Sequence, residues 1–105
     1  MNRESFKDHV LDQLRGIQPE CRGMFGGFGL YANRKFFGII FKGRLYFKTT
    51  EQTRAAYLER GMKHFRPNDR QQLFSYLEVP ADILEETDTL TRWANEAIQS
   101  ANDIT

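Results

Sequence analysis

The sequence predicts a two-layer α+β domain, with a mainly antiparallel, five-stranded sheet and helices on one face. Apolar residues recur at helical spacing in several segments, and aromatic and β-branched residues cut by glycine fill positions 23–49. The connections within 23–49 are short enough only for hairpins. Each amphipathic helix must bury its apolar stripe, and 105 residues are too few to cover both faces of such a sheet. One face should therefore stay open.

A first helix is predicted near the N-terminus. Asn2 can serve as its N-cap, and Gly16 followed by Pro19 ends it. Its apolar stripe consists of residues three or four positions apart: Phe6, Val10, Leu14 and Ile17.

Three strands follow, at about 23–31, 35–42 and 44–49. Asn33-Arg34 and Gly43 mark the turns, because Asn and Gly tolerate positive φ. The whole order is then helix, three strands, helix, two strands, helix.

A second helix should be capped by Thr49 or Thr50 and end at Gly61. With Thr49 as the cap, Gln52 would complete a capping box. Two strands, at 63–66 and 71–79, are expected on either side of the turn-rich residues 67–69.

The C-terminal part predicts a short helical piece at 80–85 and then a longer helix capped by Thr87 or Asp88. The stripe of this last helix is the strongest helix signal in the chain: Leu90, Trp93, Ala94, Ala97, Ile98 and Ala101.

Composition bounds the class of protein. A net charge of +1 argues against a strongly basic nucleic-acid module. The single cysteine, Cys21, cannot form an intramolecular disulfide and is typical of a free thiol in a reducing cytosol. No apolar run approaches the ~20 residues of a membrane helix, and no signal-peptide core is visible. We therefore expect a cytoplasmic protein without a membrane partner.

The glycine-rich segment 26–29 could be interpreted as a phosphate-binding loop, but it lacks the Lys-Ser/Thr ending of such loops. It also leads into strand residues, whereas phosphate-binding loops lead into a helix. A bent or bulged strand is the better interpretation.

Alternation places Arg44, Tyr46 and Lys48 on the open face of the sheet, and Phe74 and Tyr76 have compatible parity. Rings and cations together are typical of single-strand nucleic-acid platforms. The alternatives are a solvated face and a face covered by a second copy of the chain, which the high aromatic content favours.

A second candidate is a basic rim around the later hairpin, capable of binding anions. The acidic C-terminal part of the chain offers a competing partner for these cations, within one chain or across a dimer. The rim comprises Arg60, Lys63, His64, Arg66 and Arg70.

Catalytic chemistry has little support. The histidines, His9 and His64, lie on different predicted elements, and the adjacent Glu85 and Glu86 would point apart on a helix. No metal-ligand spacing is present. We predict no catalytic residue, no cofactor and no metal.

The glycine-aromatic segment contributes the motif residues Met24, Phe25, Gly26, Gly27, Gly29 and Tyr31. Further motifs are the strand 43–48, the segment 75–80 and the single residues Arg54, Leu84, Leu90, Trp93 and Ala94. In this order, the set resembles the amino-terminal domain of the TfoX/Sxy family of bacterial regulators of natural competence. The resemblance spans about Phe6 to Ala101.

The resemblance implies a secretion-chaperone-like fold with sheet order 5-4-1-2-3, whose central, glycine-rich first strand packs closely under a helix. Relatives of that fold commonly form homodimers. Full-length regulators carry a second, C-terminal domain resembling helical DNA-binding modules. Residues 1–105 are expected to form a single domain without it.

The resemblance also implies a non-enzymatic regulatory or protein-interaction domain in the control of competence genes. Its partner would be a protein, such as a component of the transcription machinery. Two alternatives stay open: a nucleic-acid-binding module that uses the open sheet face, and a small enzyme of unknown chemistry.

Overall fold

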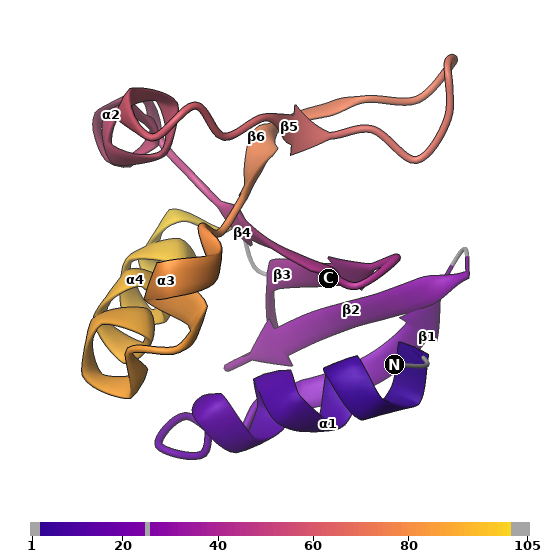
Figure 1. The fold of residues 1–105 in the computed structure, drawn as a ribbon, viewed down its shortest axis with the longest axis vertical. Helices are drawn as coiled ribbons and strands as arrows, with labels where there is room; N and C mark the ends of the chain where they lie inside the picture. Colours follow the sequence, from indigo (N-terminus) through magenta and orange to yellow (C-terminus); the bar gives the residue numbers. More distant parts are fainter. Residues whose placement is uncertain (1–2, 25, 102–105) are drawn as a thin grey trace.

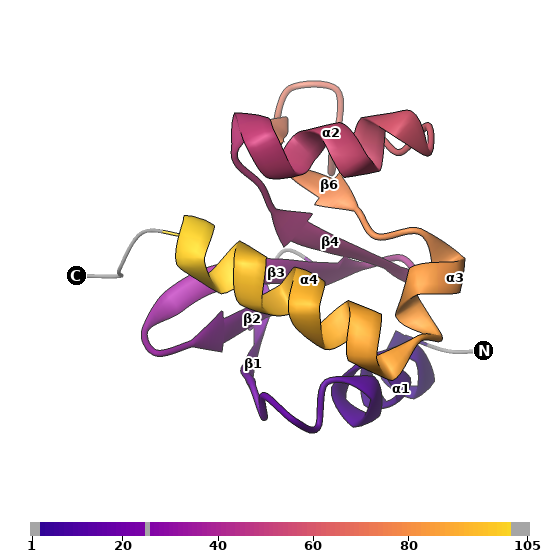
Figure 2. The ribbon, with the colours of Figure 1, turned by 90° about the vertical axis from the view of Figure 1, so that its left-hand side faces the viewer.

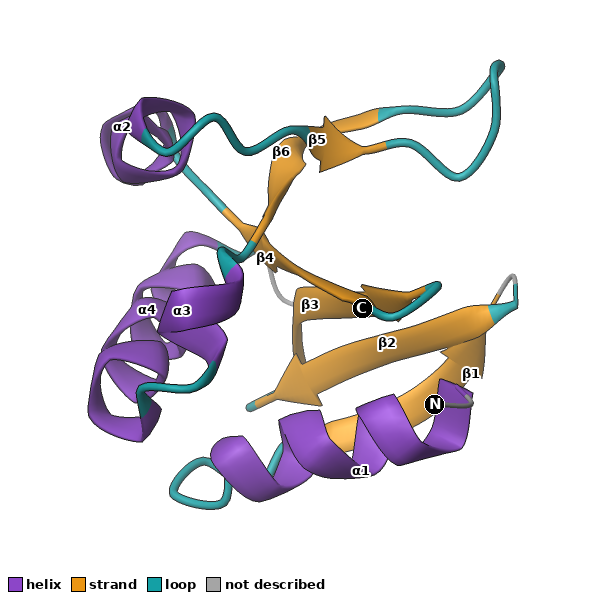
Figure 3. Cartoon of the chain, in the orientation of Figure 1, coloured by secondary structure: helices purple, strands orange, loops and turns teal. Residues whose placement is uncertain are grey.

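The fold is seen in a computed structural model that describes residues 3–24 and 26–101. The predicted N-cap Asn2 and the motif residue Phe25 therefore lie outside the described part. Along the chain, one helix is followed by four strands, a second helix, two more strands and two final helices (Figures 1 and 3). Their bounds are α1 (Arg3–Gln13), β1 (Glu20–Met24), β2 (Gly27–Ala32), β3 (Lys35–Phe41), β4 (Arg44–Lys48), α2 (Glu51–Glu59), β5 (His64–Phe65), β6 (Leu73–Glu78), α3 (Ala81–Leu84) and α4 (Thr87–Ser100).

The strands form one antiparallel, six-stranded sheet in the order β1-β2-β3-β4-β6-β5. The α+β class is confirmed, but the expected five strands and the order 5-4-1-2-3 are wrong. The predicted strand 23–31 is in fact a hairpin of β1 and β2 at one edge of the sheet. At the other end, β6 pairs with β4, so the β5–β6 hairpin extends the opposite edge.

The glycine-rich segment is a turn, not a bent central strand. Met24 pairs with Gly27 across the hairpin, and between them Gly26 has a φ of 82°, which favours glycine. A Cβ on Gly27 would overlap the carbonyl oxygen of Ile40 in β3. The close approach expected at these glycines therefore exists, but it is made by a neighbouring strand and not by a helix.

Two further hairpins use two-residue turns. Asn33 and Arg34 have φ angles of 52° and 64°, and Lys42 and Gly43 have 50° and 73°. Positive φ at both central positions is type I′ geometry, whose twist matches that of the flanking strands. The predicted turn positions are confirmed.

A β-bulge changes the direction of side chains along β3. Leu30 pairs with Gly38 while Tyr31 pairs with Phe36, which leaves Phe37 as the extra residue. Phe37 and Ile39, two positions apart, consequently lie on opposite faces, with Phe37 in the main core and Ile39 in a second cluster on the other side of the sheet.

The main core lies between the sheet and all four helices, which therefore share one face (Figure 2). The predicted stripes of α1 and α4 are confirmed, with Val10 and Leu90 fully buried. Tyr57 of α2 packs on Trp93 of α4, with ring centroids 4.7 Å apart. The strand side of this core consists of Leu30, Phe37, Ile40, Leu45, Phe47 and Leu77.

The helix starts differ slightly from prediction. The Thr50 hydroxyl accepts the Thr53 N–H, and the Thr53 hydroxyl accepts the Thr50 N–H, so Thr50 is the cap and Gln52 is not part of the capping box. Thr49 is instead buried, and its hydroxyl donates to a β6 carbonyl. The N-cap position of α4 is Glu86, one residue earlier than expected. No helix in the described part of the chain has the length and hydropathy to span a membrane.

Candidate functional site

The helix-free face of the sheet carries a second hydrophobic cluster. Ile39 and Phe65 are completely buried, and Tyr46 and Tyr76 are 9% and 7% exposed. The alternation predicted for β4 is confirmed, since Leu45 belongs to the main core and Tyr46 to this second cluster.

The β5–β6 hairpin covers part of this face. Phe65 of β5 makes edge-on contacts with Phe41 and Tyr46, at centroid distances of 5.3 and 5.0 Å. The hairpin itself continues away from the helices beyond β4 (Figure 1). The chain thus buries the rings of Tyr46 and Tyr76, two residues of the predicted interaction face, against itself.

Tyr76 is fixed by several contacts. Its hydroxyl donates to the carbonyl oxygen of Phe36 at 2.7 Å, and its ring lies 5.1 Å from the Phe36 ring. Phe36 in turn stacks on Tyr31 at 5.1 Å. Burial raises the pKa of both Tyr76 and Tyr46, so these phenols stay neutral and hold structure.

Both cations predicted for the helix-free face form hydrogen bonds with neighbouring side chains at the border of that face. Arg44 donates to Glu78 at 2.9 Å, and that hydrogen bond raises the pKa of Arg44. Lys48 donates to the Ser75 hydroxyl at 2.9 Å. Of the five predicted face residues, Phe74 alone presents a large exposed ring, with 63% of the residue accessible.

The basic rim divides into two parts. Lys63, His64, Arg66 and Arg70 lie on β5 and the loop beside it. Arg60 follows α2 and donates to Asp82 at 2.7 Å, which lowers the pKa of Asp82. This ion pair is an internal contact between the basic middle and the acidic end of the chain.

The loop between β5 and β6 is held by its own side chains. The Asn68 side-chain oxygen accepts the N–H groups of Arg70 and Gln71, at 2.8 and 3.0 Å. Arg66 pairs with Asp69 at 3.3 Å. The loop encloses a cavity of about 290 Å³ lined by Phe65, Pro67, Arg70, Gln71, Gln72 and Leu73.

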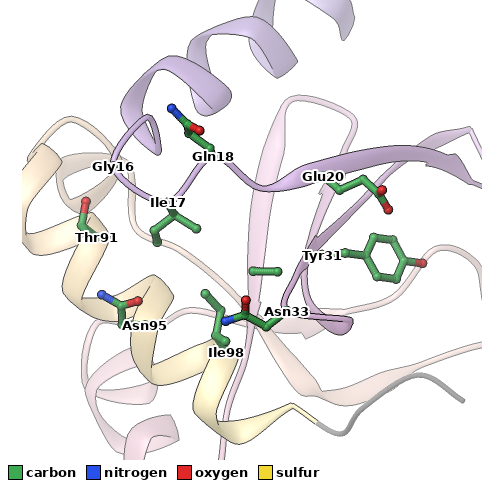
Figure 4. Close-up of a pocket in the computed structure, with 10 residues that line it drawn as sticks. Gly16, Ile17, Gln18, Glu20, Tyr31, Asn33, Thr91, Asn95 and Ile98 are labelled. Carbon is green, nitrogen blue, oxygen red and sulfur yellow. The ribbon is translucent and has the colours of Figure 1, made fainter.

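A larger groove of about 410 Å³ lies between the α1–β1 loop, the end of β2 and α4 (Figure 4). Ile17 and Ile98 provide apolar surface, and Asn33 and Asn95 contribute carboxamide groups. It is completed by Gly16, Gln18, Glu20, Tyr31, Ala32 and Thr91. Sequence reasoning did not find this groove, because its walls come from three segments far apart in the chain.

One wall of the groove is strained. Gln18 has a φ of 55°, a region unfavourable for a residue with a Cβ and for one that precedes proline. Its N–H bonds the carbonyl of Leu14 at 3.0 Å, so it closes the last turn after α1. The strain therefore has a structural reason and does not by itself indicate a ligand.

The described residues bring no reactive constellation together. His9 bonds Glu85 at 2.9 Å, whereas His64 bonds Gln72 at 2.9 Å on a different element. No group of three or more potential metal-ligating side chains gathers within residues 3–24 and 26–101.

The fold defines a small α+β domain with one helix-covered and one partly self-covered sheet face. Within that class, the chain belongs to the TfoX N-terminal domain family, whose model matches residues 11–101. The family resemblance noted in the sequence is thereby confirmed. A search of curated proteins gives no match.

Proposed function

We propose that this chain is a non-enzymatic regulatory domain that acts in the cytoplasm by binding a protein partner, in the transcriptional control of competence genes. The observation that carries the proposal is the anchored β5–β6 hairpin. Phe65 fixes it to the second cluster, while Leu73 and Phe74 are 37% and 63% exposed. Family membership over residues 11–101 supports the same conclusion.

Exposed apolar side chains beside cations are characteristic of recognition surfaces. Phe74 and Leu73 are neighbours on β6, and Arg70 lines the same cavity as Leu73. An anchored element loses little conformational entropy when it binds, so such a small surface can still be effective.

Site-specific photo-crosslinking in a native host tests this proposal. A photoreactive residue in place of Phe74 should give discrete protein adducts, identified by mass spectrometry. The same residue in place of Gln99, which is exposed on α4, is the matched control and should not give those adducts. Absence of protein adducts at every exposed position tried, together with a reproducible turnover activity, would refute a binding role.

A nucleic-acid-binding module is the second candidate, favoured by the exposed Phe74 ring, 63% accessible, beside the basic residues of the hairpin. Anisotropy with single- and double-stranded oligonucleotides separates it from the first. Real binding should weaken steeply with salt and in the variants Arg44→Ala and Lys48→Ala. Unchanged anisotropy at low salt removes this candidate.

Homodimerisation through the helix-free face is a separate proposal. The rings that first suggested it are partly covered by the hairpin, so the contact would involve the border residues Arg44, Lys48 and Phe74. Light scattering should show a dimer at high micromolar concentration. A monomer under those conditions contradicts the proposal.

A further inference from the structure

We propose that the β5–β6 hairpin binds an acidic segment of a partner protein, which places one apolar side chain in the hairpin cavity. This inference rests on the proposed protein-binding function and adds the chemistry of the partner.

The cavity has the size and lining for one side chain. Its volume of about 290 Å³ lies at the lower end of ligand pockets, which begin near ~300 Å³. Phe65, Pro67 and Leu73 provide apolar walls, and Phe65 is completely buried beneath it. An aliphatic or aromatic side chain is therefore a better occupant than a cofactor.

The charges around the cavity favour an acidic chain. Arg70 lines the cavity and forms no ion pair within the described residues. Lys63 lies further along the hairpin, where its carbonyl oxygen accepts the Glu78 N–H, and it adds positive charge without touching the cavity. Arg66 forms an ion pair with Asp69, a side chain that is almost fully exposed. The Arg70 guanidinium, which is available to a partner, thus lies beside the apolar walls, as recognition of a carboxylate next to an apolar anchor requires.

The polar walls are already positioned. Gln72 is held by His64 at 2.9 Å, and the side chain of Gln71 accepts a hydrogen bond from Asn68 at 3.0 Å. Asn68 also binds two backbone N–H groups of the loop. A partner would meet a preorganised surface, which lowers the entropy lost on binding.

A nucleic acid fits these observations less well. His64 already covers one face of the Phe74 ring, at 4.5 Å between centroids. Two cations without ion pairs in the hairpin, Lys63 and Arg70, would neutralise few phosphates. A cavity for a single side chain also adds nothing to the binding of a stacked base.

The test is a heteronuclear NMR titration of the full chain with short peptides of alternating Asp and Glu that carry one central Leu, Ile, Phe or Met. At least one peptide should shift amides within residues 63–74 saturably. Replacing its anchor with Gly should weaken binding about tenfold, because a buried apolar side chain is lost. Arg70→Glu should weaken it about fivefold. The matched charge reversal Arg92→Glu, on exposed α4, should have no effect.

Three results overturn the inference: binding that does not depend on the anchor, shifts confined to another surface, or tighter binding of an oligonucleotide to residues 63–74. Arg70 and Arg92 are both exposed, so neither charge reversal should unfold the protein, and the amide spectrum of each variant checks this directly. Crosslinking to a protein partner through a different surface would support the proposed protein-binding function but refute the hairpin as the binding site.

Discussion

Gln18 shows how a single backbone angle stores strain at the end of α1. Its φ of 55° costs about 1 kcal/mol or more for a residue with a Cβ, and Pro19 adds to the restriction. We expect Gln18→Gly to be more stable to urea than Gln18→Ala by about 1 kcal/mol, because both variants lack the side-chain carboxamide and the relief of strain at positive φ outweighs the larger unfolded-chain entropy of glycine. Equal stability of the two variants would show that the angle relaxes without cost.

Gly27 illustrates a steric requirement that sequence alone cannot locate. Gly27→Ala should destabilise the domain by about 2 kcal/mol, because the new methyl group meets the backbone carbonyl of Ile40. Gly23→Ala, in the paired strand β1, is the control, because a Cβ at Gly23 contacts nothing within 4 Å. Thermal unfolding of both variants measures the difference. A Gly27→Ala loss no larger than that of the control contradicts this account.

The glycines also show where sequence reasoning stops at the residue scale. Three glycines close together predicted either a bent strand or a close approach; the close approach exists at Gly27, whereas the bent strand is in fact a turn between β1 and β2. The decision between a strand and a hairpin depended on Gly26 having a positive φ. The steric need at Gly27 depended on Ile40, which follows it by thirteen positions and becomes a neighbour only through strand pairing.

At the scale of elements, Phe65 is expected to hold the β5–β6 hairpin in place. Phe65→Ala removes a fully buried ring that contacts Phe41 and Tyr46, and should cost about 3–5 kcal/mol. Phe74→Ala, on the same hairpin, removes an exposed ring and should stay within about 0.5 kcal/mol. Urea unfolding gives both values, and amide exchange should show faster opening of β5 and β6 in the first variant. Similar losses for both rings would mean that the hairpin is anchored elsewhere.

The helices and two turns were predictable because their signals are local. The stripe around Trp93 and the pair Asn33-Arg34 need only neighbouring residues to be recognised. The sheet order was not predictable, because pairing of β4 with β6 joins Phe47 to Leu77 across thirty positions. No periodicity within either strand specifies that partner.

The candidate site follows the same division. The basic residues of the hairpin, including Lys63 and Arg70, could be named from the sequence as a rim. The cavity could not, because it exists only when the loop brings Phe65 and Leu73 together. Burial of Tyr46 also required knowledge of how the hairpin curls, since alternation gives the face of a strand but not what lies above it.

For the whole molecule, the buried tyrosines predict a loss of stability in alkali, with Tyr57 and Tyr76 contributing more than Tyr46. Burial raises the pKa of Tyr57 and Tyr76 above the ordinary value of about 10, so the folded protein retains protons that the unfolded chain releases. Stability should be complete below about pH 10 and fall as the pH rises through the folded pKa values, by at most about 1.4 kcal/mol per pH unit for each group. Urea unfolding followed by circular dichroism over this range measures the slope.

Tyr76→Phe provides the control for this pH dependence. The variant loses the hydrogen bond to the Phe36 carbonyl, which should lower stability at neutral pH by about 1 kcal/mol. It also removes one of the three tyrosines, Tyr46, Tyr57 and Tyr76, whose pKa burial raises, so the alkaline slope should become shallower. An unchanged slope would assign the effect to other groups.

The hairpin has a consequence for how members of this family could diverge. Most of the hydrogen bonds made by side chains of the loop 66–72 join residues within that loop. The contacts that attach the hairpin to the rest of the domain include those of the Phe65 ring with Phe41 and Tyr46. Substitutions in the tip therefore leave both hydrophobic cores intact. A single scaffold can accept many different tips, so drift in this loop would change the surface that the hairpin presents without requiring the domain to evolve a new fold.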